Sequence, residues 1–306
     1  MKVIIAAAGT GGHINPGIAI ANKIKEKEKD SEIIFLGTVR GLENDLVPRA
    51  GYNLKTVEAY GYGRSLNFEN IKKVLRNFKG ISETKKIIKD FKPDIIIGTG
   101  GYISAIACIA AKKYKIPVVL HESNAFPGAS VKMFAKKVNC ILVGFEDAKK
   151  RLSKAKKVII TGTPTKIKNT KLTEEDKLKI KKELGFKDAN KPLILVYGGS
   201  QGAKSINETL IEIIVKKLNE NYQIMWAAGP TQYDLIKEEL DKNNININNI
   251  ENIKIVPYIY NMEEIMNISD LVVCRSGAMT ITEIALIRKT SNIYTISSCS
   301  RKSSRI

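Results

Sequence analysis

The chain has 306 residues, more than one hydrophobic core of typical size needs, so two domains are expected. Its formal net charge of +19 favours a polyanion or an anionic membrane surface as partner, although lysines scattered over solvated faces explain part of the excess. The four cysteines are widely spaced and form no C-x-x-C pair, which argues against a zinc knuckle or a disulfide framework and favours a reducing, cytoplasmic setting.

In the first half of the chain, short β-branched runs alternate with amphipathic segments. The predicted strands are residues 3–8, 32–37, 95–98, 118–121, 140–143 and 158–161. This alternation is typical of a doubly wound parallel sheet. No segment approaches the ~20 apolar residues that span a bilayer. The first run ends at a glycine turn and not at a small-residue cleavage site, so we expect no signal peptide.

The first strand leads into a glycine-rich turn, residues 9–13 (Gly-Thr-Gly-Gly-His). The turn is not a dinucleotide fingerprint, because Ile14 stands where the third glycine belongs, and it lacks the Gly-Lys-Ser/Thr of a P-loop. Such a turn can still bring backbone N–H groups and a helix N-terminus toward an anion. His13 begins the next helix, where an uncharged imidazole could act as a general base; a capping or packing role is the alternative.

Two more strand ends in this half carry polar residues. Residues 121–124 (His-Glu-Ser-Asn) follow one strand, and Asn124 could bind sugar hydroxyls or cap a helix. Residues 98–102 (Gly-Thr-Gly-Gly-Tyr) follow another strand and could admit a phosphate. Because ligands of parallel α/β sheets bind beyond the carboxyl ends of the strands, these segments are expected to face one cleft.

The second half begins a new series of strands after a predicted linker, which starts at residues 162–165 (Gly-Thr-Pro-Thr). The predicted strands are residues 193–197, 223–227, 253–256 and 271–274. The first of them leads into another glycine turn, residues 198–202. We therefore expect two facing α/β domains, residues 1–164 and 165–306, and not one large sheet. The asparagine-rich segment 243–252 predicts a loop.

The last predicted strand is followed by residues 275–280, whose free N–H groups could bind a diphosphate. Glu283, expected on the first turn of the next helix, could accept two ribose hydroxyls or form a capping box with Thr280. There is no D-x-D pair and no cluster with metal-ligand spacing. A departing diphosphate would then depend on helix N-termini, backbone donors and a cation such as Lys166.

Six motifs in order resemble the MurG family of bacterial glycosyltransferases. They are residues 9–13, 37–43, 98–102, 121–124, 198–203 and 275–280. The resemblance covers the chain to about residue 286 and implies a GT-B fold of two Rossmann-like domains. It implies metal-independent, inverting transfer of N-acetylglucosamine from UDP-N-acetylglucosamine to the 4-hydroxyl of undecaprenyl-pyrophosphoryl-N-acetylmuramyl-pentapeptide in peptidoglycan synthesis, with no cofactor. It also implies a peripheral location on the cytoplasmic face of the bacterial cell membrane.

The resemblance also assigns roles to residues. The donor would be held in the second domain, with phosphate, uracil, sugar and ribose contacts from Ser200, Ile259, Ala278, Met279, Thr280 and Glu283. The first domain would reach the N-acetylglucosamine with Thr10, Gly11, Gly12 and Asn124. It would approach the acceptor phosphate with Gly100, Gly101 and Tyr102. His13 is the leading candidate to deprotonate the acceptor hydroxyl, with Glu122 and Asp45 as alternatives.

Two departures from the family pattern stand out. Residues 162–166 (Gly-Thr-Pro-Thr-Lys) replace Gly-Asn-Pro-x-Arg, which keeps a charge but loses the guanidinium fork. After Ile287 the expected Gly-Lys-Pro and next strand are missing, and the chain ends in a serine-rich, basic run, residues 297–306. We therefore expect a truncated or frameshifted copy with an incomplete second domain, an aberrant tail from about residue 288 and weak or no activity.

A basic amphipathic segment predicts contact with an anionic membrane surface. Its apolar face comprises Ile71, Val74, Leu75, Phe78 and Ile81. Its basic flank comprises Lys72, Lys73, Arg76 and Lys79. Core packing explains the apolar face about as well. The alternatives to the transferase are a related UDP-sugar epimerase or glycolipid glycosyltransferase, or a non-catalytic sugar-nucleotide-binding remnant. No nucleic-acid recognition module accompanies the charge.

Overall fold

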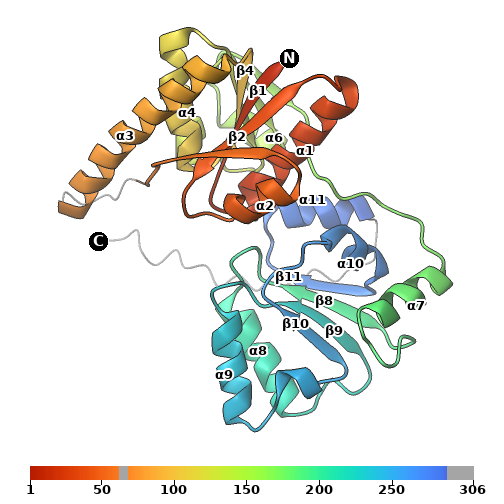
Figure 1. Ribbon diagram of the computed structural model, residues 1–306. Helices are drawn as coiled ribbons and strands as arrows, with labels where there is room; N and C mark the ends of the chain where they lie inside the picture. Colours follow the sequence, from red (N-terminus) through yellow and green to blue (C-terminus); the bar gives the residue numbers. More distant parts are fainter. Residues whose placement is uncertain (62–67, 288–306) are drawn as a thin grey trace. The chain divides into compact units, whose positions relative to one another are not determined.

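The computed structural model describes residues 1–61 and 68–287, and within them the chain forms two compact units, divided between Lys166 and Ile167 (Figure 1). We call these unit 1 and unit 2. Each unit is a parallel sheet with helices on its faces, which confirms the predicted α/β class.

Unit 1 alternates strands and helices along its length. Its strands are β1 (Lys2–Ala7), β2 (Glu32–Thr38), β3 (Asn53–Val57), β4 (Ile95–Gly100), β5 (Val118–Glu122), β6 (Cys140–Val143) and β7 (Val158–Ile160). Its helices are α1 (Gly11–Lys27), α2 (Glu43–Arg49), α3 (Phe68–Phe91), α4 (Gly101–Tyr114), α5 (Ala129–Phe134) and α6 (Glu146–Lys150). The sequence pattern missed β3, because this edge strand is mostly exposed and only Val57 is buried in it.

The sheet of unit 1 has the strand order β3-β2-β1-β4-β5-β6-β7, all parallel. In register, Ile4 of β1 lies between Ile34 of β2 and Ile96 of β4. Helix α1 packs on one face, where Gly17 approaches Ile5 closely, and α3 and α4 cover the face of Ile4. The order of the strands reverses direction between β1 and β4, so a binding crevice is expected beyond the ends of these two strands.

Unit 2 repeats this architecture in a smaller sheet. Its strands are β8 (Leu193–Tyr197), β9 (Gln223–Ala227), β10 (Ile253–Val256) and β11 (Leu271–Cys274), in the spatial order β10-β9-β8-β11. Its helices are α7 (Glu174–Glu183), α8 (Lys204–Val215), α9 (Tyr233–Lys242), α10 (Met262–Ile268) and α11 (Ala278–Ile287), with a short 3-10 helix, η1 (Ile247–Asn249), in the predicted asparagine-rich loop. All these strands have the predicted bounds, and the strand order reverses here between β8 and β11.

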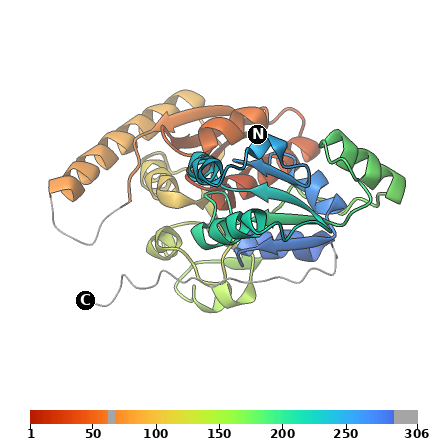
Figure 2. The ribbon, with the colours of Figure 1, turned by 90° about the horizontal axis from the view of Figure 1, so that it is seen from below.

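The side chains of β8 alternate between the two faces of the sheet. Leu193, Leu195 and Tyr197 pack with residues of α7, α10 and α11, whereas Val196 packs with α8 and α9. Figures 1 and 2 show these helices on either side of the sheet. The period of two explains why this apolar run forms a strand buried on both faces.

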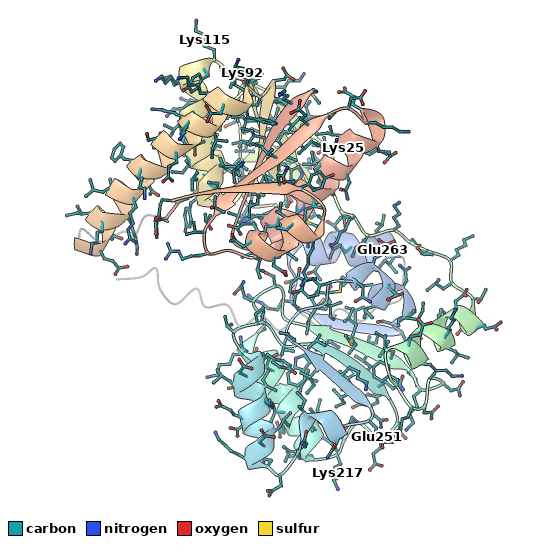
Figure 3. The ribbon with its side chains drawn as sticks, viewed as in Figure 1. Lys25, Lys92, Lys115, Lys217, Glu251 and Glu263 are labelled. Atoms are coloured by element: carbon teal, nitrogen blue, oxygen red, sulfur yellow. The ribbon has the colours of Figure 1, made fainter. Side chains whose placement is uncertain are left out.

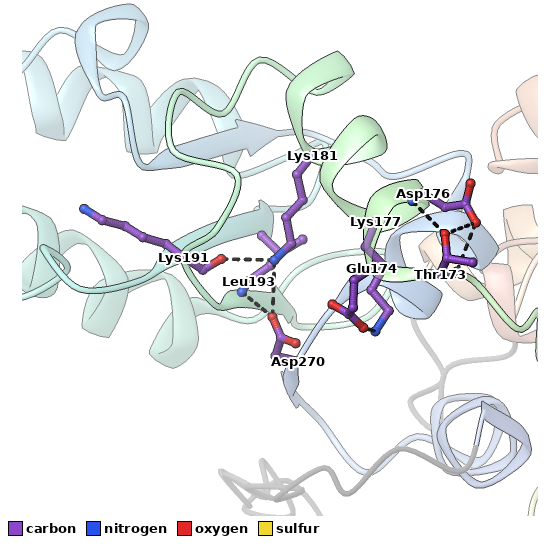
Figure 4. A network of polar contacts seen from close by, with 8 residues as sticks. All are labelled: Thr173, Glu174, Asp176, Lys177, Lys181, Lys191, Leu193 and Asp270. Carbon is purple, nitrogen blue, oxygen red and sulfur yellow. Dashed lines mark hydrogen bonds and ion pairs between the residues drawn. The ribbon is translucent and has the colours of Figure 1, made fainter.

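A polar network fastens α7 to the amino end of the sheet in unit 2 (Figure 4). A capping box begins the helix, with the Thr173 hydroxyl and the Asp176 carboxylate each bonded to the other residue's backbone N–H. The buried Lys181 ammonium donates to the Lys191 carbonyl at 3.0 Å and pairs with Asp270 at 3.4 Å. Asp270 also accepts a hydrogen bond from the Leu193 N–H at 2.8 Å.

Lysines project from the surfaces of both units. Figure 3 shows Lys92 and Lys115 on unit 1 and Lys217 on unit 2, all exposed. Part of the net positive charge is therefore spread over solvated faces.

Candidate active site

The turn after β1 is tied to the end of β2 by a buried carboxylate. Glu43, at the start of α2, is fully buried. It accepts a hydrogen bond from the Gly9 N–H at 2.8 Å, and its other oxygen accepts from the N–H and the hydroxyl of Thr38 at 2.8 and 2.7 Å. Two neighbouring glycines make room for it: an added Cβ would lie 2.7 Å from Glu43 Cγ at Gly37 and 1.9 Å from Glu43 Oε2 at Gly41. No local sequence pattern indicated that Glu43 anchors this turn.

His13 lies in the first turn of α1, half-buried. Its Nδ1 is 3.2 Å from the Ala8 carbonyl oxygen. Since a carbonyl oxygen can only accept, Nδ1 carries the proton of the neutral ring and Nε2 holds the lone pair. The backbone carbonyl of His13 accepts a hydrogen bond from the Thr99 hydroxyl at 2.7 Å, which fixes the helix start to β4.

The structure brings the first turn against the turn that begins α4. An added Cβ at Gly100 would lie 2.3 Å from the His13 ring, and one at Gly101 would lie 2.9 Å from the Ala8 carbonyl oxygen. Both glycines also have positive φ, +133° and +77°. Tyr102 follows them, with 58% of its surface exposed. His13, Gly100 and Gly101 therefore form one site, at the point where the strand order of unit 1 reverses.

The end of β5 is fixed by Glu122, which is 5% exposed. One carboxylate oxygen accepts hydrogen bonds from the backbone and side-chain N–H groups of Asn124, at 2.9 and 2.8 Å, and the other accepts from the Gly128 N–H at 2.6 Å. These contacts give Glu122 the role of an anchor for the loop that presents the exposed Asn124. The helix-cap alternative for Asn124 is wrong, because α5 begins at Ala129 with Gly128 as its N-cap.

Asp45, the other alternative base, lies on α2 in an ion pair of 2.6 Å with Arg49. His121 is buried at the end of β5, and its Nε2–H donates to the Gly162 carbonyl at 3.2 Å. Burial lowers the pKa of His121, against the smaller opposing effects of that carbonyl and of Glu122. His121 therefore ties β5 to the segment that leads out of unit 1. Lys166 is the last residue of unit 1 and is half-buried.

In unit 2 the turn after β8 is built on glycines with left-handed backbone. Gly199 and Gly202 have φ of +94° and +75°, and the Gly202 N–H donates to the Gly199 carbonyl at 3.0 Å. Ser200 lies half-buried in this turn, and α8 begins just beyond it. The turn therefore lies at the reversal point of the unit 2 sheet, with a helix N-terminus behind it.

The other side of this reversal point is the start of α11. The helix begins at Ala278, after the exposed residues 275–277, so Ala278, Met279 and Thr280 all lie in its first turn. Thr280 therefore lies inside the helix, and the capping-box alternative is wrong. Glu283 lies on the second turn, not the first as predicted. Both Thr280 and Glu283 are 9% exposed.

Ile259 was predicted to lie against uracil. Its side chain is 3% exposed and packs in the core of unit 2, so a base can reach this residue only through its backbone. Among residues 1–61 and 68–287, no group of three or more His, Cys, Asp or Glu is arranged to hold a metal ion.

Each unit thus has a parallel sheet with a glycine turn and a helix N-terminus where its strand order reverses. This arrangement, repeated in one chain, is that of the GT-B class of two-domain α/β proteins, to which sugar-nucleotide-dependent glycosyltransferases belong.

Comparison with known proteins narrows the class. Models of the glycosyltransferase family 28 N-terminal and C-terminal domains match residues 3–143 and 193–293. The UDP-N-acetylglucosamine--N-acetylmuramyl-(pentapeptide) pyrophosphoryl-undecaprenol N-acetylglucosamine transferase of Caldanaerobacter subterraneus subsp. tengcongensis is 40% identical over 292 residues, which are 94% of this chain and 77% of that protein. The transferase of the same name from Clostridioides difficile is 40% identical over 295 residues, 96% of this chain and 70% of that protein.

The crystal structure of Acinetobacter baumannii MurG superposes with a TM-score of 0.62 and 25% identity, and the match covers 97% of this chain and 80% of that one. The chain belongs to the MurG family, within glycosyltransferase family 28, as the ordered motifs predicted. It spans about three quarters of the length of the relative from Caldanaerobacter.

Proposed function

We propose that the chain transfers N-acetylglucosamine from UDP-N-acetylglucosamine to undecaprenyl-pyrophosphoryl-N-acetylmuramyl-pentapeptide, the reaction for which its relatives are named. The observation that carries the proposal within the structure is the fixed tautomer of His13, set by the Ala8 carbonyl at the reversal point of unit 1. A neutral imidazole with its Nε2 lone pair available is what a hydroxyl nucleophile requires.

In this mechanism His13 Nε2 takes the proton of the acceptor 4-hydroxyl as the oxygen attacks the anomeric carbon of the donor. The new C–O bond forms while the bond from that carbon to the UDP oxygen breaks, so the configuration inverts and UDP leaves with the electron pair. The Ala8 carbonyl holds Nδ1, so Nε2 is the ring nitrogen that can take the proton. The imidazolium then returns its proton to solvent.

The donor is held mainly by unit 2 in this proposal. The N–H groups of the 198–202 turn with Ser200, and those at the start of α11 with Ala278, Met279 and Thr280, face the diphosphate and sugar. Glu283 accepts the ribose hydroxyls, and the backbone of Ile259 contacts uracil. Lys166 adds a positive charge. The helix N-termini stabilise the charge that develops on UDP as it leaves.

The same proposal gives unit 1 contacts with the donor sugar and with the acceptor. Thr10, Gly11 and Gly12 reach the N-acetylglucosamine together with Asn124, whose loop is held by Glu122. Gly100, Gly101 and Tyr102 approach the acceptor phosphate from the start of α4.

We also propose that α3 carries unit 1 on the anionic cytoplasmic face of the membrane, where a lipid-linked acceptor resides. Ile71, Leu75 and Phe78 are 56%, 64% and 65% exposed, and their spacing places them on one helical face. Ile81 instead packs against the core. Part of the predicted apolar face is therefore used in core packing, and the exposed part is the one proposed to contact the membrane. Figures 1 and 2 show the beginning of α3 extending beyond the sheet of unit 1. No described helix is long and apolar enough to cross a bilayer.

The transferase proposal is tested with purified protein, radiolabelled UDP-N-acetylglucosamine and a short-chain lipid acceptor. We expect a disaccharide-lipid product with inverted configuration and one UDP released for each sugar transferred, at the low rate that the departures from the family pattern predict. Interconversion of the donor sugar without acceptor would instead indicate an epimerase. Binding of UDP with no product at any pH would contradict the proposal and favour a binding remnant.

A further inference from the structure

One buried amide links three segments of unit 2. Asn207, in the first turn of α8, is 3% exposed. Its Nδ2 donates to the Ala228 carbonyl at 2.9 Å and to Gln232 Oε1 at 2.7 Å, and its Oδ1 accepts from the Trp226 indole N–H at 3.0 Å. The orientation of the amide is unambiguous, because the indole nitrogen can only donate and the carbonyl can only accept.

The segment that Asn207 holds lies directly against the glycine turn after β8. An added Cβ at Gly202 would lie 2.1 Å from the Ala228 carbonyl oxygen, and one at Gly229 would lie 2.5 Å from the Gln201 carbonyl oxygen. Both glycines have positive φ, +75° and +95°. The two turns therefore pack backbone to backbone with no side chain between them, so a shift of residues 228–229 must move residues 201–202.

We propose that Asn207 is a positioning residue for the donor diphosphate. Its amide holds the 228–232 turn, and that turn sets the backbone of residues 198–202, whose N–H groups bind the diphosphate in the function proposed above, on which this inference rests. The ligand chemistry is a nucleoside diphosphate. Trp226, fully buried and bonded to Asn207, supports the same arrangement from β9.

The test compares two amide-to-carboxylate variants. Asn207→Asp keeps the size of the side chain and an oxygen facing Trp226, but it loses the donors to Ala228 and Gln232. Gln223→Glu is the matched control: Gln223 is fully buried at the start of β9, and its amide donates to the Asp188 carbonyl at 2.7 Å, at the opposite end of the sheet. The two variants make the same chemical change in the same unit, so general destabilisation affects both.

Titration calorimetry with UDP and steady-state kinetics give the readouts. We expect Asn207→Asp to raise the Kd of UDP and the KM of the sugar donor about tenfold, with a much smaller change in kcat. We expect Gln223→Glu to change the Kd and the KM by less than about twofold. Trp226→Phe, which removes the indole N–H and also reduces the volume of this fully buried ring, is expected to weaken UDP binding by about threefold. It keeps the test decisive if Asn207→Asp fails to fold.

The outcomes separate the two proposals. Wild-type protein that binds UDP with a Kd unchanged in Asn207→Asp and Trp226→Phe would overturn the positioning role alone. Equal weakening by Gln223→Glu would also overturn it, because the effect would then be general. A wild-type protein that binds no UDP would overturn the proposed function together with this inference.

Discussion

The backbone N–H of Gly9, in the turn after β1, donates a 2.8 Å hydrogen bond to the buried carboxylate of Glu43, the first residue of α2. The same carboxylate holds the end of β2 through Thr38, so the first glycine turn is fixed to the start of α2 and to the end of β2. A buried charge is tolerated here because each oxygen receives hydrogen bonds.

Replacing Glu43 should loosen the end of the sheet in unit 1. In Glu43→Ala the exposed Gly9 N–H and the half-buried Thr38 lose their shared acceptor, at about 0.5–1.5 kcal/mol for each hydrogen bond. We expect peptides from β1 and β2 to exchange their amide hydrogens much faster, while peptides from β8 and β9 serve as an internal reference. Glu26→Ala, which removes an exposed ion pair with Lys23, is the control. Equal protection of β1 and β2 in the two variants would refute the anchoring role.

The contact between Gly100 and His13 gives a test of the proposed base. We expect His13→Ala to lower kcat by about 10²–10⁴ with little change in UDP affinity. Gly100→Ala should also lower kcat, because its Cβ would displace the His13 ring. Gly51→Ala is the matched control, since Gly51 also has positive φ, +82°, but an added Cβ there meets no atom within 4 Å.

The double variant of His13 and Gly100 tests whether Gly100→Ala acts through His13. If Gly100→Ala acts through His13, adding His13→Ala should lower kcat no further than His13→Ala alone. Multiplied losses in the double variant would show that Gly100 acts independently of the histidine.

Burial of His121 predicts a loss of stability in acid. Its pKa is lower in the folded chain than the ordinary value of 6.5, so the folded state binds fewer protons than the unfolded state. The contribution of His121 to the free energy of unfolding is present above the pKa of His121 in the unfolded chain. It is lost as pH falls through the pKa of His121 in the folded chain. Urea midpoints followed by circular dichroism should fall between about pH 7.5 and about pH 5.5. The fall should be smaller in His121→Gln. A pH dependence of the urea midpoint that persists in His121→Gln and disappears in His13→Gln would show that His13 causes it.

The exposed residues of α3 predict charge-dependent membrane binding. A triple change to serine at Ile71, Leu75 and Phe78 removes apolar surface without touching Ile81 in the core. We expect wild-type protein to co-sediment with anionic liposomes more than with neutral ones, and the variant to bind at least about tenfold more weakly.

The control for this experiment is a triple change to serine at Val215, Leu218 and Leu235, which are 39%, 59% and 62% exposed on unit 2. It removes a similar amount of apolar surface elsewhere. Equal loss of liposome binding in the two triple variants would show that exposed apolar residues bind liposomes wherever they lie, and would contradict a specific membrane-binding face on α3.

Local sequence patterns predicted most of this fold because most of its strands are short β-branched runs, and β1, β4 and β8 lead into glycine turns. The runs at β8 to β11 have their predicted bounds, and the order of the glycine motifs indicated the family. The sequence pattern missed β3 because an exposed edge strand contains few buried apolar residues. The position of Thr280 inside α11, and not at its cap, depended on where the helix begins, which no local signal marked.

The sequence by itself determined the elements, the turns and the chemical types gathered at their ends, because periodicity and turn chemistry act over a few neighbouring residues. Only the tertiary structure decided which ends meet: β1 beside β4, which places His13 against Gly100, and β9 beside β8, which places Gly229 against Gln201. It also decided that Glu43, Glu122 and Asn207 hold backbone groups in place. Strand order and buried hydrogen-bond partners are set by pairing between segments that are distant in the chain. A local sequence pattern therefore does not predict them.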